Sequence, residues 1–193
     1  FLKTKPQRKS IIFTSVLVAV VLLSAFLTFG SMRLWAEGIA YYTNDDANWS
    51  GYNLEGDFSV EIDLSDLESN VGKILYSDEK HKIYVSNLQN VDTQYIIYFR
   101  SVGDYSSKGA SLISGLQHIK EQGSYATEMS AKMVTEYNGK SYSSEEAGAT
   151  GLNYKDGDEF GFYMFPAEAY NSKEKSTVKL TVSNLYKNIW ERK

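Results

Sequence analysis

The sequence predicts an all-β protein, an antiparallel β-sandwich with jelly-roll-like connections, preceded by one N-terminal transmembrane or signal-anchor α-helix. Three observations predict this class. No charged residue lies between Lys9 and Arg33, most of the remaining chain alternates apolar and polar residues with period two, and turn signals recur after about 8 to 15 residues. Strand patterns do not alternate with helical patterns, so a parallel sheet is not expected.

The uncharged segment predicts a membrane helix over residues 11–32. Ile11 to Phe29 is almost entirely aliphatic or aromatic, and as a helix it rises about 28 Å, close to the ~30 Å of a bilayer's hydrocarbon core. The basic residues before it are Lys3, Lys5, Arg8 and Lys9. Because lysine and arginine near a span stay cytoplasmic, we expect residues 1–10 inside the cell and the rest of this single-pass protein outside. A cleaved signal, leaving a secreted domain, is the alternative.

The chain beyond Trp35 is acidic and free of cysteine. It holds all 24 Asp and Glu but 15 of the 20 Lys and Arg, a net charge near −9. This charge disfavours nucleic acid and anionic lipid as partners. Without disulfides the domain relies on its core, as many bacterial surface proteins do. We expect residues 33–56 to form a juxtamembrane linker with an aromatic loop, and residues 57–193 to form one extracellular domain.

Four segments predict strands. Residues 57–64 and 177–182 alternate strictly, as half-buried strands do. The expected inward residues are Phe58, Val60, Ile62, Leu64, Val178, Leu180 and Val182. Residues 94–102 and 159–165 are apolar on both faces and are predicted as central strands, the second ended by Pro166.

Two hairpins and one helix complete the prediction. Residues 73–76 and 82–85 flank a charged turn, and residues 128–137 and 140–143 flank Asn138-Gly139, which suits a type I′ turn. Ser111 to Gln122 places leucine and isoleucine at helical spacing before Gly123, which predicts a short amphipathic helix. A strand over residues 110–119 is the alternative.

Three carboxylates, Glu61, Asp63 and Asp66, lie within six residues. The stretch resembles the Glu-x-Asp-x-(x)-Glu motif of laminarinase-like retaining glycosidases, which are β-sandwiches. The resemblance implies that one carboxylate attacks the sugar while another protonates the leaving oxygen. Position 66 departs from the motif, with Asp where the second Glu is expected. The alternative is that Glu61 and Asp63 form the solvated face of a strand.

Other catalytic chemistry has little support, and we expect a protein that is not an enzyme and has no cofactor. His81 and His118 are the two histidines, too few for a convincing zinc site, and no Gly-x-Ser-x-Gly elbow is present. Calcium is the more credible ion, because hard oxygens surround Gly157. They belong to Asn153, Asp156, Asp158 and Glu159, and residues 44–48 form a second cluster. Ordinary turn chemistry is the alternative for both clusters.

Aromatic residues gather in the least periodic stretch of the exported part, at Tyr41, Tyr42, Trp49 and Tyr52. Exposed rings bind sugars and proteins, because they bury a large area at low entropic cost. We therefore expect a membrane-anchored, non-catalytic module that binds a glycan, a cell-envelope component or a protein partner through these rings. The alternatives are a structural or accessory subunit of a membrane complex or surface polymer, and a glycoside hydrolase that uses Glu61, Asp63 and Asp66. The pattern does not indicate an oligomeric state.

Overall fold

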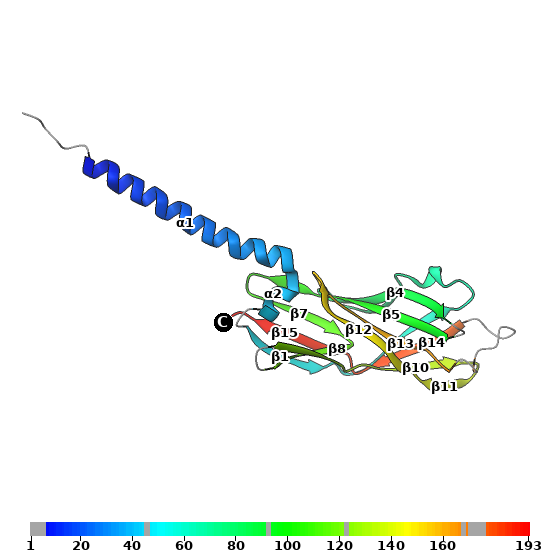
Figure 1. Ribbon diagram of the computed structural model, residues 1–193. Coiled ribbons are helices and arrows are strands. Elements are labelled where there is room, and N and C mark those ends of the chain that lie inside the picture. The colour runs from blue at the N-terminus through cyan, green and yellow to red at the C-terminus, as the bar shows by residue number, and fades with distance from the viewer. Residues whose placement is uncertain (1–6, 45–46, 92–93, 122–123, 167–168, 170–176) are drawn as a thin grey trace, which may run out of the picture.

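A computed structural model shows one long helix followed by a body of β-sheets (Figure 1). The structure describes residues 7–44, 47–91, 94–121, 124–166, 169 and 177–193, and the side chains of residues 7–11 and 26–30 lie outside this description. The helical elements are α1 (Gln7–Glu37), η1 (Gly38–Ala40), α2 (Tyr41–Asn44) and η2 (Glu68–Asn70). The strands are β1 (Asn48–Asn53), β2 (Asp57–Asp63), β3 (Ile74–Ser77), β4 (Lys82–Val91), β5 (Gln94–Val102), β6 (Asp104–Ser106), β7 (Gly109–Ser114), β8 (Leu116–Glu121), β9 (Ser124–Met129), β10 (Lys132–Tyr137), β11 (Lys140–Ser143), β12 (Glu145–Tyr154), β13 (Gly157–Tyr163), β14 (Thr177–Ser183) and β15 (Tyr186–Glu191).

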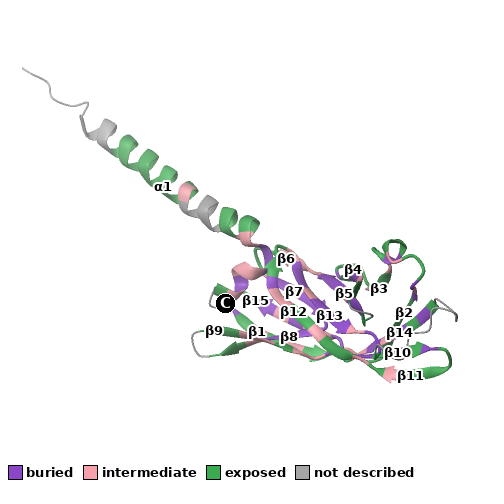
Figure 2. Ribbon diagram, turned by 45° about the vertical axis from the view of Figure 1, so that its right-hand side comes forward, coloured by how far each residue is buried: buried purple, intermediate pink, exposed green. Residues whose placement is uncertain are grey.

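The described strands pair antiparallel throughout, which confirms the predicted all-β class. Sheet A has the order β1-β15-β7-β6, sheet B has the order β11-β10-β14-β2, and sheet C has the order β12-β13-β5-β4-β3. Strands β8 and β9 form a separate hairpin. The arrangement is that of a β-sandwich, with buried residues between the layers (Figure 2).

The main core lies between sheets B and C. Sheet B contributes the inward side chains of the alternating strands β2 and β14, and sheet C contributes those of β5 and β13. Among them are Val60, Ile62, Val178, Leu180, Ile97, Phe99, Phe160 and Phe162. This burial confirms the alternation predicted over residues 57–64 and 177–182, and the central position predicted for residues 94–102.

A second, smaller core fixes the end of α1 to the body. It contains Ile39, Tyr42, Leu112, Leu152 and Trp190. The Ile39 N–H donates to the carbonyl oxygen of Lys155 over 2.8 Å, and the Lys155 ammonium lies 4.1 Å from the centre of the Trp35 ring. Gly38 has a φ of +62°, and a Cβ there would overlap the same carbonyl. Only glycine therefore allows the chain to turn this closely from α1 into the body.

Helix α1 extends away from the sheets (Figures 1 and 2). Its exposed apolar residues occupy every side of the helix between residues 12 and 23: Ile12, Phe13, Val16, Leu17, Val18, Val20, Val21, Leu22 and Leu23. Over the part of the chain that the structure describes, no helix is long and apolar enough to cross a membrane. Of the predicted span 11–32, the side chains of residue 11 and residues 26–30 lie outside that part.

The predicted helix over Ser111–Gln122 is wrong. Residues 109–114 form β7 and residues 116–121 form β8, whereas residues 122 and 123 lie outside the described residues. Pairing decides the outcome, because β7 lies between β15 and β6 and buries both faces, with Leu112 in the small core and Ile113 in the main core. Gly115 separates the two strands where a Cβ would come within 2.6 Å of the Phe160 ring.

Both predicted hairpins exist. Strands β3 and β4 flank the charged turn, and β10 and β11 flank Asn138 and Gly139, whose φ angles of 51° and 73° confirm the predicted turn. The predicted strand 128–137 is interrupted, because Ser130 and Ala131 both donate their N–H groups to the carbonyl of Gly115. As a result β9 pairs with β8, whereas β10 belongs to sheet B.

The alternation of β14 can be tested directly. Leu180 is fully buried in the main core, so Leu180→Ala is expected to lower the free energy of unfolding by about 2–5 kcal/mol through lost burial and a residual cavity. Lys179→Ala is the control. Its ammonium lies 3.9 Å from Glu136 with both side chains about half exposed, so it is expected to change stability by no more than about 0.5 kcal/mol. Urea unfolding measures both, and equal effects would contradict the assigned faces.

Candidate functional site

The structure separates the four aromatic residues that the sequence grouped. Tyr42 is buried rather than exposed, because its ring fills the small core and its hydroxyl donates to the Ser106 carbonyl. Tyr41 packs edge-on against it at 5.2 Å. Trp49 packs edge-on against Trp190 at 5.8 Å. Tyr52, 54% exposed, is the one of the four that presents a largely solvent-exposed ring.

Tyr52 lies on the face of sheet A opposite the small core, and this face is partly covered, because Ile113 in the same row is buried in the main core. Cross-strand partners point to the same side of a sheet, and two adjacent rows define this face: Ser50, Ile189, Ser111 and Asp104, then Tyr52, Lys187 and Ile113. The opposite side of sheet A carries Leu112 and Trp190 into the small core. We call the side with Tyr52 and Ser111 the Ser111 face.

An open cavity of about 250 Å³ lies on the Ser111 face. Its lining comes from β6, β7, β15, the turn between β6 and β7 and the turn between β3 and β4: Lys80, Asp104, Ser106, Lys108, Gly109, Ala110, Ser111, Ile189, Trp190 and Glu191. The Lys80 ammonium lies 3.2 Å from the Asp104 carboxylate. The cavity is therefore polar, with charges of both signs beside a serine hydroxyl.

The turn between β3 and β4 places a histidine against that serine. Asp78 Oδ1 accepts the N–H groups of Lys80 and His81, each over 2.7 Å, which closes the turn. Both oxygens of the same carboxylate lie 3.0 Å from His81 Nδ1. His81 Nε2 lies 2.8 Å from Ser111 Oγ. Because the carboxylate requires a donor at Nδ1, the network assigns the lone pair to Nε2, where it accepts the Ser111 hydroxyl.

Electrostatics keep the Asp78 carboxylate ionised. Burial by itself raises its pKa, but the hydrogen bonds from the Lys80 N–H, the His81 ring, the Tyr76 hydroxyl and the His81 N–H together hold the pKa of Asp78 well below its usual range. Burial and the bond to Asp78 raise the pKa of Tyr76 to about 12, with a smaller contribution from Tyr52. Tyr76 therefore stays protonated and donates to Asp78 over 2.8 Å.

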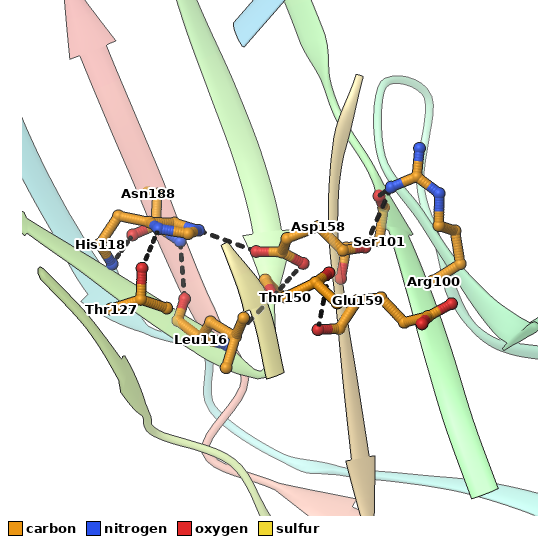
Figure 3. Close-up of polar contacts among 10 residues, drawn as sticks. Arg100, Ser101, Leu116, His118, Thr127, Thr150, Asp158, Glu159 and Asn188 are labelled. Carbon is orange, nitrogen blue, oxygen red and sulfur yellow. Dashed lines mark hydrogen bonds and ion pairs between the residues drawn. The ribbon is translucent and has the colours of Figure 1, made fainter. Parts of the chain in front are cut away.

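A second histidine lies in a closed polar network between the sheets (Figure 3). His118 Nε2 lies 2.8 Å from Asp158 Oδ2, with both side chains 0% exposed. Ser114 Oγ donates to Asp158 Oδ1 over 2.7 Å, and Thr127 Oγ1 lies 3.1 Å from His118 Nδ1. Asn188 accepts the His118 N–H and donates to the Leu116 carbonyl, each over 2.9 Å. Every polar atom named here has a partner, which is what burial requires.

The predicted calcium ligands are not brought together. Asp158 faces His118 in the interior. Asp156 contacts Arg100, whose guanidinium lies 3.5 Å from the centre of the Tyr154 ring, and Glu159 on the opposite face of β13 accepts the Ser86 hydroxyl over 2.7 Å. Asn153 is exposed. The described residues contain no group of three or more acidic or histidine side chains that could hold a metal. Of the second cluster, residues 45 and 46 lie outside the description.

The predicted glycosidase carboxylates occupy separate settings. Glu61 lies in a row with Lys179 and Glu136 on the outer face of sheet B and lines an open cavity of about 730 Å³. Asp63 Oδ1 accepts the Ser65 N–H over 2.8 Å. Asp66 lies past the end of β2, where Oδ1 accepts the Ser69 N–H over 3.2 Å. Asp63 and Asp66 thus serve the local turn, which is the structural use of short carboxylates near a strand end.

Asp78 and Ser111 are not among the residues that the sequence pattern indicated as a site. The Asp-x-x-His spacing of residues 78–81 is the local signal, because it lets one carboxylate close a turn and orient the ring. Nothing local indicates Ser111, which is 30 residues from His81 and was assigned to a helix. In comparisons with family models, curated proteins and solved structures, no match to this chain was found. The structure therefore defines a class, an antiparallel β-sandwich with a polar site on the Ser111 face of sheet A.

Removing the buried carboxylate tests the closed network. Asp158→Ala leaves the Ser114 hydroxyl and the His118 ring without their acceptor, so the free energy of unfolding is expected to fall by about 3–5 kcal/mol. Thr127→Val removes a single neutral hydrogen bond and is expected to cost about 1 kcal/mol. Urea unfolding followed by tryptophan fluorescence measures both changes. A loss below about 1 kcal/mol for Asp158→Ala would show that the network is not a structural centre.

The turn predicts a pH dependence. Because the folded-state pKa of Asp78 lies below its unfolded value, its hydrogen bonds stabilise the protein above about pH 4, and that contribution disappears as the pH falls from there toward the folded pKa. Asp78→Asn is therefore expected to be less stable than the wild type at pH 7, with the difference shrinking below pH 4. Urea midpoints at pH 7, 5 and 3 measure this. A difference that does not change with pH would contradict it.

Proposed function

We propose that this protein is a membrane-anchored extracellular module that binds a cell-envelope glycan through its Ser111 face. One observation carries the proposal: the exposed Tyr52 ring shares this face with an open polar cavity. Sugar rings stack on exposed tyrosine while their hydroxyls bond to nearby charged and hydroxyl groups. Lys80, Asp104 and Glu191 supply such groups within the cavity.

Anchoring by residues 11–32 is the second part of the proposal. Its support is the run without charge between Lys9 and Arg33 and the exposure of apolar side chains on every side of α1 from residue 12 to residue 23. A helix that is apolar all round is stable where lipid or protein surrounds it. The basic residues before Ser10 favour a cytoplasmic N-terminus, with the sheets outside the cell.

Glycan binding is tested by retention of the purified full-length protein on insoluble cell wall. Tyr52→Ala is expected to weaken retention about tenfold, because one well-placed ring contributes about 1.4 kcal/mol or more. Tyr154→Ala, which removes a 39% exposed ring from β12, is the control and is expected to leave retention unchanged; because that ring packs on Arg100, thermal unfolding establishes that the variant is folded. Trp49→Ala is unsuitable, since that ring packs on Trp190. If the domain binds a protein instead, wild-type retention disappears after protease treatment of the wall.

Anchoring is tested by flotation of the full-length protein with neutral vesicles. Replacing Val16, Val20 and Leu23 by aspartate is expected to abolish flotation, because each charge costs about 2.5–3.5 kcal/mol at the centre of a membrane helix. Three aspartates at Ser59, Ser141 and Ser143, exposed serines of sheet B, add the same charge and form the control. Flotation by the α1 triple variant at the wild-type level would exclude this segment as the anchor. A subunit role would instead appear as a second chain at fixed stoichiometry in the floated fraction.

A further inference from the structure

We propose that Ser111 is a catalytic nucleophile, activated by His81 and Asp78, and that the cavity beside it hydrolyses esters of short carboxylic acids. This activity goes beyond the binding role proposed above. It is carried by two independent observations, the hydrogen-bond chain through His81 and the opening of Ser111 onto a cavity.

The contacts run in the order nucleophile, base and orienting carboxylate, from Ser111 through His81 to Asp78. Ser111 Oγ is 2.8 Å from His81 Nε2, and His81 Nδ1 is 3.0 Å from Asp78. Both distances lie within the range that such a proton transfer needs. The carboxylate holds the ring in the tautomer whose free nitrogen faces the serine. His81 is itself rigid, since its side chain is 1% exposed and its N–H is part of the Asp78 turn.

The other histidine shows what a purely structural arrangement looks like here. The His118 ring has the reverse polarity, with Nε2 toward Asp158 and Nδ1 toward Thr127. Both His118 and Asp158 are closed off from solvent. Ser111, in contrast, lines a cavity that is open to solvent. A substrate can therefore reach Ser111 and not the His118 network.

The size and charge of the cavity limit the substrate. About 250 Å³ is below the ~300–1,000 Å³ of sites for drug-sized ligands, so the acyl group is short, such as acetyl or propionyl. Two lysines, Lys80 and Lys108, and two carboxylates, Asp104 and Glu191, line the cavity, so its formal charges balance. A neutral ester suits such a lining better than a charged one, and a lysine beside the carbonyl oxygen stabilises the negative charge that develops there. The open side leaves room for an alcohol of any length.

The reaction needs water as its only co-reactant. Ser111 Oγ forms a bond to the acyl carbon while its proton passes to His81 Nε2. The bond from that carbon to the alcohol oxygen then breaks, and the alcohol leaves with the proton from His81. Water next gives one proton to His81 and its oxygen to the acyl carbon, which releases the carboxylic acid. Ser111 recovers its proton, and both the serine and the histidine return to their starting state.

The test is covalent labelling of the full-length protein in detergent with a small fluorophosphonate, followed by intact-mass and peptide analysis. One adduct per chain, on Ser111, is expected, together with hydrolysis of p-nitrophenyl acetate. His81→Gln is expected to lower the labelling rate about 100-fold or more, and Asp78→Asn is expected to lower it as well. Ser59→Ala, at a serine on sheet B, is the matched control and is expected to label at the wild-type rate. Thermal unfolding of each variant establishes that it is folded.

The alternative is that the hydrogen bond between His81 and Ser111 only holds the β3–β4 turn against β7, in which case Ser111 is not a nucleophile. No adduct on the wild type would overturn the proposal, and so would adducts spread over several serines or labelling that a folded His81→Gln variant retains. If His81→Gln does not fold, the labelling rate of Asp78→Asn is used instead, and a rate equal to that of the wild type would overturn the proposal. The binding proposal is separate: labelling without wall retention contradicts binding alone, and wall retention without labelling contradicts the nucleophile alone.

Discussion

The buried Asp158 carboxylate is the constraint on which the rest of the body depends. A carboxylate without water must receive hydrogen bonds from the protein, or its burial costs several kcal/mol. His118 from β8 and Ser114 from β7 supply them, and Thr127 and Asn188 complete the partners of the ring and of the β8 backbone. One side chain on β13 thereby connects strands of sheet A, sheet C and the β8–β9 hairpin.

That constraint sets the geometry of the site on the Ser111 face. Ser114 is bound to Asp158 three residues after Ser111 on the same strand, so β7 has little freedom to move along its length. The β3–β4 turn approaches from sheet C, and Asp78 fixes both its backbone and the His81 ring. Two rigid elements therefore hold His81 Nε2 at 2.8 Å from Ser111 Oγ. Preorganisation of this kind is what binding and catalysis on a surface require, because little motion remains to be lost.

The sequence predicted those features that depend on local pattern. Strand alternation placed Ile62 and Leu180 in the core, and Asn138-Gly139 specified its turn. Prediction failed where partners distant in sequence decide the outcome. Residues 111–122 have helical spacing, but residues 111–114 and 116–121 are held as strands by β15, β6 and β9, and Tyr42 packs in the small core instead of in a loop. The carboxylates near Gly157 predicted a calcium site from their closeness in the sequence. In the structure, successive residues of β13 point to opposite faces, so Asp158 points inward and Glu159 points outward. The jelly-roll-like connectivity stays a prediction.

Two carboxylates orient two histidine rings in opposite senses, one at an accessible site and one in the interior. Two-dimensional nitrogen–proton NMR of histidine-labelled protein at neutral pH reports which ring nitrogen carries the proton. We expect His81 to carry it on Nδ1 and His118 to carry it on Nε2. If both rings show the same tautomer, or if His81 carries its proton on Nε2, the two rings are not oriented in opposite senses and His81 is not a base toward Ser111.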